Sequence, residues 1–225
     1  MDRTRRCNPS PIRHPSRERS VAIYTTIEKD YVVATFKSLI IVASAALALP
    51  SAALAADTFA LDPAHTQTVF TISHLGYSMI TGSFHELKGT LSLDQKAPEH
   101  SSIDVTIGAT SIDTGFPARD DVLRSKAFFD VADFPTLEFK STKVVLTGKE
   151  TADVQGSLTV LGVTKPVVLK VQFNRLAPDQ MRNNAVAVGF TGTASIKRSD
   201  FGMKAYLPYI GDDVKITVNF EGVQQ

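Results

Sequence analysis

The sequence contains no tryptophan and a single cysteine, Cys7, among its 225 residues. Because no thiol follows residue 55, disulfides, cysteine–metal sites and a cysteine nucleophile are excluded from the rest of the chain. Neither a Gly-x-Ser-x-Gly elbow nor a His-Glu-x-x-His zinc motif is present. Basic residues are few as well, since residues 56–225 hold 16 Lys and Arg against 19 Asp and Glu, a net charge of −3. Affinity for nucleic acid comes largely from Lys and Arg, so a nucleic-acid partner is not expected.

Residues 1–55 differ in composition from the rest of the chain, with eight basic against four acidic residues and none of the 13 glycines. The uncharged run SLIIVASAALAL at residues 38–49 follows Lys37 and precedes Ala53-Leu54-Ala55. A basic start, an apolar middle and a small-x-small site are typical of a Sec-type secretory signal. The alternative, an uncleaved anchor, is disfavoured because a membrane span needs about 20 apolar residues. We predict cleavage after Ala55 and a periplasmic location.

The Arg-, Pro- and Ser-rich residues 1–32 are not needed by such a signal. We therefore expect translation to begin near Val33. The sequence divides into residues 1–55, an extension plus signal, and residues 56–225, which contain no linker, repeat or low-complexity segment and form one domain.

Alternation of apolar and polar residues dominates from Phe59 onward, which is the pattern of half-buried β-strands. Clear runs of this kind lie at residues 68–74, 87–93, 103–109, 137–146, 154–160, 167–173, 186–196 and 214–220. Turn residues separate them at 148–150, 161–163, 178–180 and 211–213. About eight successive strands with short connections favour an antiparallel sandwich or barrel. The barrel is preferred because it leaves no sheet edge exposed.

One segment departs from the alternation and predicts a short inserted helix over residues 119–128. Val122, Leu123, Lys126 and Phe129 follow helical spacing. Acidic residues stand at its expected start, where they complement the helix dipole.

The inward positions of such a barrel mix large and small residues, the small ones being Gly89, Ala109, Gly156, Gly192 and Ala194. Small inward residues leave room for a ligand in a barrel of this size. They also serve tight barrel corners, where backbones approach closely. The sequence leaves both interpretations open.

Few polar residues stand where chemistry is expected. His74 is in phase with Phe70 and Ile72, so it faces the interior, where we expect it to close one end by hydrogen bonding. A metal site needs three or four convergent ligands, and no histidine spacing here predicts one. Arg119 next to Asp120, and Arg198 two residues before Asp200, form either local ion pairs or a polar mouth for a ligand head group.

Five blocks of sequence together resemble the YceI-like lipid- and polyisoprenoid-binding family. They are LDPAHT with FTISHLG (61–66 and 70–76), SIDTG with RD, LRS and FFDV (111–131), FPTLEFKST (134–142), GSLTVLGVTKPV (156–167), and RSDFGM with GDDV (198–203 and 211–214). The blocks occur in order and span nearly all of residues 58–222.

The resemblance implies an extended, lipocalin-like antiparallel β-barrel with one helix, exported to the periplasm and often dimeric. It implies a bound isoprenoid or fatty lipid, such as a quinone tail or a prenyl phosphate, as ligand rather than cofactor. It carries over no catalytic residue and no metal. Transient contact with the membrane, or with membrane-bound lipid enzymes, is an expected partnership.

We predict two groups of ligand-binding residues. The apolar pocket residues are Phe70, Ile72, Leu91, Ile107, Phe129, Phe139, Leu158, Val171, Phe190 and Met203. The polar mouth residues are His74, Arg119, Asp120 and Arg198. A lipid carrier is the favoured function. One alternative is an enzyme that acts on a lipid in the same barrel, with His74, Arg119, Asp120 and Asp200 as its polar groups. The other is an envelope-stress or interaction protein with a filled barrel.

Overall fold

The computed structural model describes residues 56–225, so the predicted signal and the extension before it lie outside the described residues. The strands are β1 (Asp57–Leu61), β2 (Gln67–His74), β3 (Ser78–Phe84), β4 (Leu87–Leu93), β5 (Ser102–Gly108), β6 (Ile112–Asp113), β7 (Thr136–Leu146), β8 (Thr151–Val160), β9 (Val163–Asp179), β10 (Ala185–Lys197) and β11 (Ile210–Gln224). The α-helix of the described part is α1 (Pro117–Arg124), and short 3₁₀ helices lie at Pro98–His100, Ala109–Ser111, Gln180–Arg182 and Arg198–Phe201.

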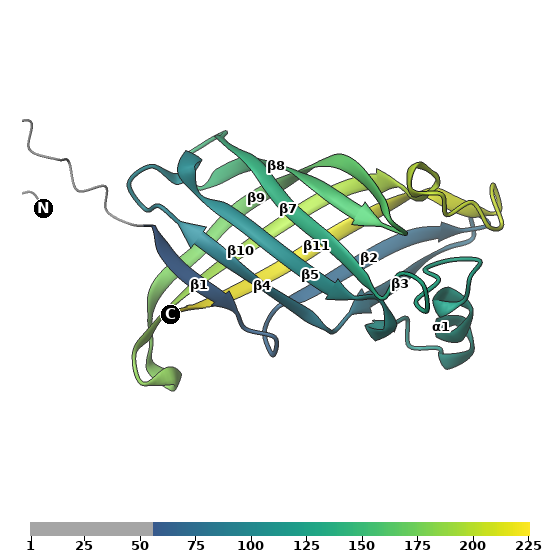
Figure 1. The fold of residues 1–225 in the computed structure, drawn as a ribbon, viewed down its shortest axis with the longest axis horizontal. Coiled ribbons are helices and arrows are strands. Elements are labelled where there is room, and N and C mark those ends of the chain that lie inside the picture. Colours follow the sequence, from purple (N-terminus) through teal and green to yellow (C-terminus); the bar gives the residue numbers. More distant parts are fainter. Residues whose placement is uncertain (1–55) are drawn as a thin grey trace, which may run out of the picture. The chain divides into compact units, whose positions relative to one another are not determined.

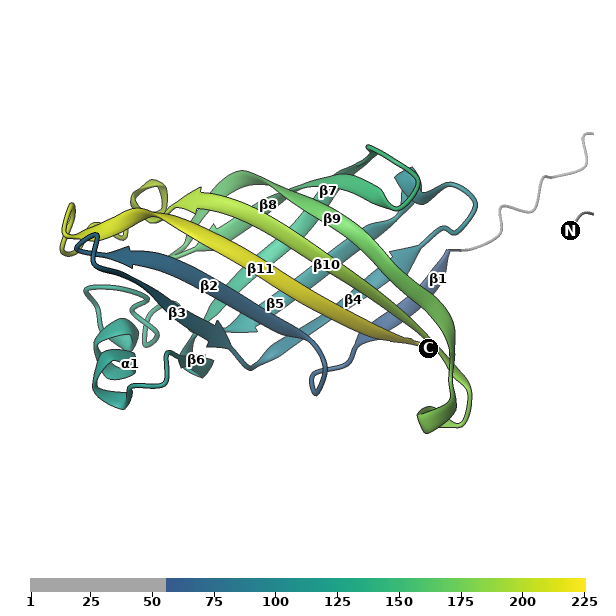
Figure 2. The same cartoon turned by 180° about the vertical axis from the view of Figure 1, so that it is seen from behind.

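Eight antiparallel strands form a closed ring, in the order β1-β4-β5-β7-β8-β9-β10-β11 and back to β1 (Figures 1 and 2). The β1–β11 pairing that closes the ring is short and joins Phe59 to Gln224 and Leu61 to Gly222. This confirms the predicted all-β barrel of about eight strands with one helix. Closure leaves the long strands β9, β10 and β11 with partners on both sides.

The ring is split along one side by a second pairing of β11. Over residues 214–219, β11 pairs with β2 instead of β1, and β2 leads on to β3 and β6. The segment that contains α1 follows β6 and lies beside β3 at this end of the barrel (Figure 2). It is held there by Arg124, whose guanidinium donates to the carbonyls of Thr110 at 2.9 Å and Ile112 at 2.7 Å.

The helix boundaries differ from the prediction of residues 119–128. Pro117 occupies the first turn, where its fixed φ favours a helix start, so α1 begins two residues earlier. It ends at Arg124 because Ser125 turns to extended geometry, and the backbone and hydroxyl groups of Ser125 both donate to Val122 O. The following residues, including Phe129, form turns rather than helix.

Two predicted turns differ from the structure. The turn expected at residues 178–180 begins only after Asp179, where β9 ends and the 3₁₀ helix Gln180–Arg182 follows. Residues 211–213 lie within β11, at a shift of register between Ile210 and Val214, so the Gly-Asp-Asp triplet marks a bulge. The turn at residues 161–163 is present as a tight hairpin in which Leu161 (φ 53°) and Gly162 (φ 70°) both adopt the left-handed region. Two positive φ values are typical of the hairpin turn that matches strand twist.

Small inward residues serve two different purposes. A Cβ added at Gly156 would lie 2.4 Å from Phe139 Cζ, and one at Gly89 would lie 2.2 Å from Asp104 O. These glycines permit close approach of a ring and of a neighbouring strand, and they give a ligand no room. At Gly192 the added Cβ would meet only Val171 Cγ2, at 3.7 Å. Of the five small inward residues, Gly192 and Ala194 on β10 are the two that line the interior cavity.

This contrast predicts a difference in stability between two chemically identical substitutions. Gly156→Ala should lower the free energy of unfolding by about 2 kcal/mol, since overpacking of a tight site costs on that order. Gly192→Ala should change it by less than about 0.5 kcal/mol. Urea denaturation followed by circular dichroism measures both values, and equal losses in the two variants would contradict this assignment.

Side chains fill the interior completely where β1 closes the ring. Phe59 and Val188 are completely or almost completely buried, and Phe220 packs with Phe59 around Gly222. Because this part of the interior is filled by side chains, it fixes the ring and leaves the remainder of the barrel free to enclose a space.

Candidate functional site

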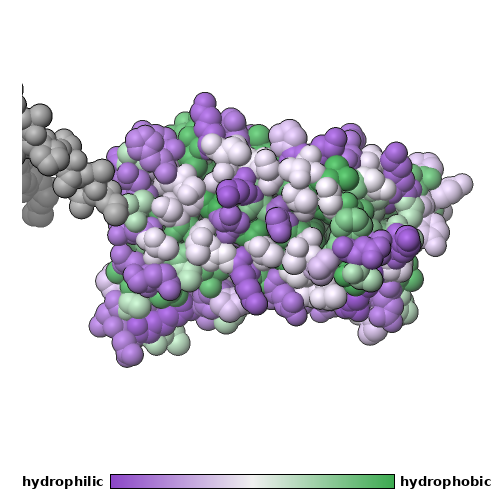
Figure 3. All heavy atoms as spheres, viewed as in Figure 1, coloured by the Kyte–Doolittle hydropathy of each residue, from purple (hydrophilic) through white to green (hydrophobic). Residues whose placement is uncertain are grey.

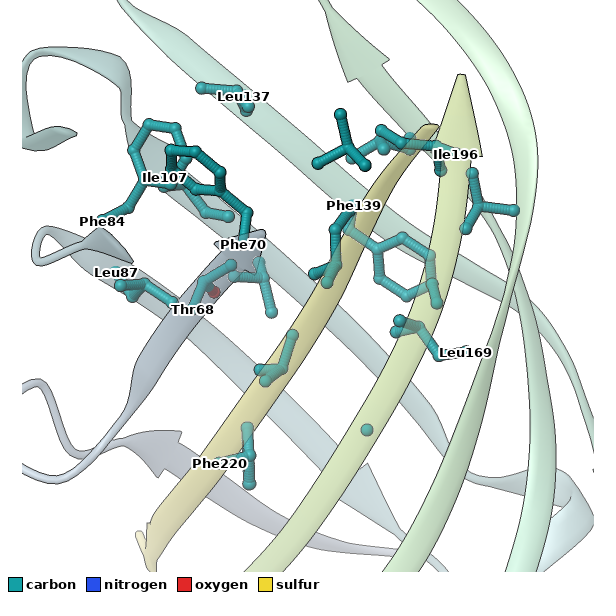
Figure 4. A pocket seen from close by; sticks show the side chains of 18 of the residues that line it. Thr68, Phe70, Phe84, Leu87, Ile107, Leu137, Phe139, Leu169, Ile196 and Phe220 are labelled. Carbon is teal, nitrogen blue, oxygen red and sulfur yellow. The ribbon is translucent and has the colours of Figure 1, made fainter. Parts of the chain in front are cut away.

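An apolar cavity of about 970 Å³ occupies the barrel interior. Inward side chains of β2, β4, β5 and β7 to β11 form its wall, and Figure 4 shows several of them pointing into one common space. Its volume is at the upper end of the range of about 300–1,000 Å³ that is usual for ligand sites. The cavity is therefore large enough for a sizeable apolar ligand.

The alternation of strand residues explains why the wall is apolar while the outer surface is polar. On β11, Val214, Ile216 and Val218 face inward and the residues between them face out. On β9 an extra residue, Asn174, shifts the phase, so that Phe173 and then Leu176 face inward. On the face shown in Figure 3, the barrel is mostly purple and white, with green limited to patches.

Some inward wall residues, such as Leu91 and Phe139, are buried against their neighbours, but others are only half-buried although they point inward. Ile72, Val171 and Ile216 all retain accessible surface. A barrel filled by its own side chains would bury them as completely as Phe59 at the closed part. The interior beyond that packed part is therefore hollow.

All ten residues predicted for the apolar pocket line this cavity. Phe70 and Ile72 come from β2, and the others come from β4, β5, β7, β8, β9, β10 and the loops after α1 and β10. The structure thus brings them together on one wall. That they contact a ligand remains a prediction.

Two groups of contacting aromatic rings form part of the wall. Phe84 lies between Phe70, at a centroid distance of 5.8 Å, and Phe129, at 5.5 Å. Phe190 lies between Phe173, at 5.5 Å, and Phe220, on β11, at 6.0 Å. These tilted and edge-on contacts are the favoured geometries of aromatic pairs, so they hold the rings in place around the cavity.

Thr68 places an unpaired hydroxyl among the apolar groups of the wall. The residue is 6% exposed, and its Oγ1 is the one buried side-chain polar atom without a hydrogen-bond partner in residues 56–225 (Figure 4). A buried polar group without a partner is unfavourable. The Oγ1 atom itself has almost no accessible surface, so its missing partner is a local cost of packing and does not mark a ligand contact.

Arg119 and Asp120 meet at Thr114 and not at each other. Arg119 Nε donates to Thr114 Oγ1 at 2.7 Å and its Nη2 donates to Thr114 O at 2.8 Å. The carboxylate of Asp120 accepts from the backbone N–H and the hydroxyl of the same threonine at 2.9 and 2.5 Å. The expected ion pair between Arg119 and Asp120 is thus replaced by hydrogen bonds of both side chains to Thr114. Arg119 lines the cavity, whereas the buried Asp120 does not, because its carboxylate is turned to Thr114.

Arg198 lines the cavity but is occupied by the loop that follows it. Its Nε donates to Gly211 O at 2.8 Å and its Nη1 to Met203 O at 3.0 Å. Its Nη2 donates to Ala205 O at 2.9 Å and Ile210 O at 3.0 Å. Burial lowers the pKa of Arg198, and the nearby charge of Asp212 opposes this effect. Instead of the expected ion pair with Asp200, the guanidinium makes hydrogen bonds to four backbone carbonyls, which hold the loop in place.

His74 ends β2 and is half-buried on the cavity wall. The expectation that it closes the interior by hydrogen bonding is wrong, because its imidazole bonds to no other side chain or backbone group of residues 56–225. Its two ring nitrogens are therefore available to a ligand at this end of the cavity.

A charged cluster that no sequence motif predicts lies away from the cavity, and Asp62, His65 and Glu221 converge there like metal ligands. Arg182 stands among them. Its Nη2 bonds to Asp62 and lies 2.9 Å from His65 Nδ1 and 3.0 Å from Glu221 Oε1. Burial raises the pKa of Asp62, but hydrogen bonds from His65, the Ala64 N–H and Arg182 outweigh it and hold that pKa below its ordinary value. The guanidinium supplies the positive charge that a metal would bring, so the cluster ties three distant segments together.

Within the described residues, no helix has the length and apolar content needed to cross a membrane.

Comparison with known proteins gives one family. Residues 59–222 match the model of the YceI-like domain. A UPF0312 protein of Pseudomonas savastanoi pv. phaseolicola is 42% identical over 189 residues, which cover 80% of this chain and 96% of that protein.

Solved structures share the fold. The crystal structure of BcnA from Burkholderia cenocepacia matches with a TM-score of 0.65 at 22% identity, covering 72% of this chain and 98% of that one. A polyisoprenoid-binding domain from Saccharophagus degradans, implicated in plant cell wall breakdown, matches with a TM-score of 0.59 at 17% identity, covering 74% and 98%.

Proposed function

The chain belongs to the YceI-like family, and on that premise we propose that it is an exported protein that holds a long isoprenoid or related lipid in its barrel. The observation that carries the proposal is the apolar interior cavity of about 970 Å³, where inward residues such as Ile72, Val171 and Ile216 keep accessible surface. Burial of apolar surface contributes about 25 cal/mol per Å², so enclosing a long hydrocarbon tail is strongly favourable. A polyisoprenoid-binding relative of the same fold supports this ligand class.

Binding without turnover is the activity that the polar residues support. Asp120 is committed to Thr114, and Arg198 is committed to four carbonyls. Catalysis by acid and base requires groups within hydrogen-bond reach of each other or of the reacting atoms. His74 and Arg119 remain at the cavity, and they suit recognition of a polar or anionic head group.

Export is part of the proposal and rests on the secretory signal predicted in residues 38–55. Edman sequencing of the protein purified from periplasm should begin at Ala56. A first residue upstream of the apolar run would overturn this part of the proposal and leave the binding part standing.

Native mass spectrometry of the protein, purified without detergent, tests the binding part. We expect a mass above that of the processed chain, and we expect organic extraction to release an isoprenoid or fatty species and restore the bare mass. As a control, the extracted and refolded protein should regain mass when it is incubated with a long-chain quinone. A protein that is bare after purification and stays bare with added quinone would rule out the proposed function.

A further inference from the structure

Large exposed hydrophobic residues gather at the end of the barrel that carries α1. Of ten such residues in the described part of the chain, seven come from three segments at this end: the β2–β3 hairpin, α1 with the residue before it, and the β10–β11 loop. These seven, which we call the aromatic rim, are Leu75, Tyr77, Met79, Phe116, Val122, Tyr206 and Tyr209. Figures 1 and 2 agree in placing the three segments together at this end.

Direct contacts join the three segments into one surface. The backbone N–H of Leu75 donates to Tyr209 O at 2.8 Å, which ties the hairpin to the β10–β11 loop. The Tyr206 ring stacks on Phe128, which follows α1, at a centroid distance of 6.0 Å and an angle of 24°. Tyr77 nevertheless leaves 89% of its surface exposed. A grouped apolar surface of this kind usually marks an interaction site.

The rim is continuous with the cavity. Leu75, Val122, Tyr206 and Tyr209 line the cavity and are exposed on the outside as well. At the other end, next to the β4–β5 and β7–β8 connections, one large exposed apolar residue, Leu146, lines the cavity beside the exposed polar residues Gln95, Lys149 and Glu150. The α1 end of the cavity thus opens onto the larger group of exposed apolar side chains, and a lipid that leaves there stays in contact with them.

We infer that the aromatic rim docks on a lipid bilayer and lets a lipid pass between membrane and cavity without crossing water. This inference rests on the proposed function, because a ligand too apolar for water has to be collected from a membrane. Three of the seven rim residues are tyrosines, whose apolar ring and polar hydroxyl suit the boundary between acyl chains and head groups.

Charge indicates how the rim binds. Exposed charged residues of both signs flank it, among them Lys126 and Lys204 with Asp121 and Asp200. Residues 56–225 as a whole carry a net charge of −3. Attraction to anionic lipid is therefore not the driving force, and insertion of apolar side chains is. A second copy of the chain on the same surface would cover the mouth and stop the passage of lipid, so the bilayer is the occupant that fits a carrier.

Flotation of the protein with phosphatidylcholine vesicles tests this inference. The rim variants are Tyr77→Glu and Met79→Glu, since neither residue lines the cavity. Met181→Glu is the matched control, because Met181 is 95% exposed in the β9–β10 loop, away from the rim. We expect the parent protein and Met181→Glu to float, with little change on adding phosphatidylglycerol or salt. Each rim variant should partition about tenfold more weakly, as expected for losing the burial of one large side chain.

The lipid extracted from each variant separates this inference from the proposed function. Rim variants that keep their lipid and lose flotation support docking by the rim. Rim variants that float like the parent overturn it, as does a parent that holds lipid and fails to float. A dimer in sedimentation that the rim variants abolish, without flotation, would assign the surface to a second copy instead. A parent that floats through the rim without any bound lipid would support docking and defeat the proposed function.

Discussion

Phe190→Asp is expected to abolish lipid binding while the barrel remains folded. Phe190 is the middle ring of the Phe173–Phe190–Phe220 group on the cavity wall. A carboxylate at this position either stays hydrated and excludes an apolar chain, or loses its water at a large cost. Affinity for a lipid probe should fall by at least about 100-fold, since each 1.4 kcal/mol changes affinity tenfold. Titration with a fluorescent fatty acid, together with extraction of the purified protein, measures the effect.

Val168→Asp is the matched control for this experiment. It places the same charge on β9 between Val167 and Leu169, both of which line the cavity, but Val168 itself faces out. Binding by this variant should match that of the parent protein. If folded Phe190→Asp kept its normal lipid content, the assignment of this wall to the ligand would be wrong.

Arg198→Met is expected to be the most destabilising single substitution considered for this protein. Arg198 is 4% exposed, and its guanidinium satisfies four carbonyl oxygens of residues 203–211. Methionine keeps much of the side-chain volume and removes every donor. Because removal of one partner leaves buried acceptors unpaired, the free energy of unfolding should fall by about 3–4 kcal/mol. Urea denaturation measures this loss, and Lys204→Met, an exposed position in the same loop, should stay within about 0.5 kcal/mol of the parent.

The same pair of variants also decides between two roles for Arg198. If Arg198→Met retained its stability and lost only its lipid, the guanidinium would be a ligand contact, as predicted for a residue of the polar mouth. If the lipid-free Arg198→Met protein loses stability, the role of Arg198 is the structural one, which is to hold the loop through its four hydrogen bonds.

The strands and the inward faces could be predicted because both depend on alternation within a single strand. Phe70 with Ile72, and Val171 on β9, were placed on one wall by phase alone, and the structure puts them there. β1 and β3 received no separate prediction. β1 has only five residues, and in β3 the alternation is interrupted at Gly82, which lies beneath the ring of Phe70.

The roles of individual small residues could not be predicted, because they depend on what the neighbouring strand presents. Gly156 and Gly192 look alike in sequence, each on the inward face of a strand. Gly156 is covered by Phe139 and by the backbone of β7, whereas a Cβ at Gly192 would make only an ordinary contact with Val171. Only the cross-strand register distinguishes them.

Polar partners were the least predictable part of the site, because they come from distant or irregular segments. Sequence proximity suggested that Arg119 pairs with Asp120, but a threonine that precedes both accepts from one and donates to the other. The cluster around Arg182 joins residues that lie more than 100 positions apart, such as Asp62 and Arg182. Neither arrangement leaves a trace in spacing. The rim could not be predicted either, since the segments that carry Tyr77 and Tyr209 are brought together only by the pairing of β2 with β11.

The hollow interior links the lifetime of the protein to the supply of its lipid. Side chains such as Ile72 and Ile216 are only half-buried on the cavity wall. Under the proposed function, a bound lipid makes the apolar contacts that these side chains do not make with the protein. By mass action, a ligand at 100 times its dissociation constant stabilises the folded state by about 2.7 kcal/mol. Empty molecules then populate unfolded forms more often and are the first to be degraded by proteases. Under the proposed function, the amount of protein that persists would follow the amount of lipid available to fill it.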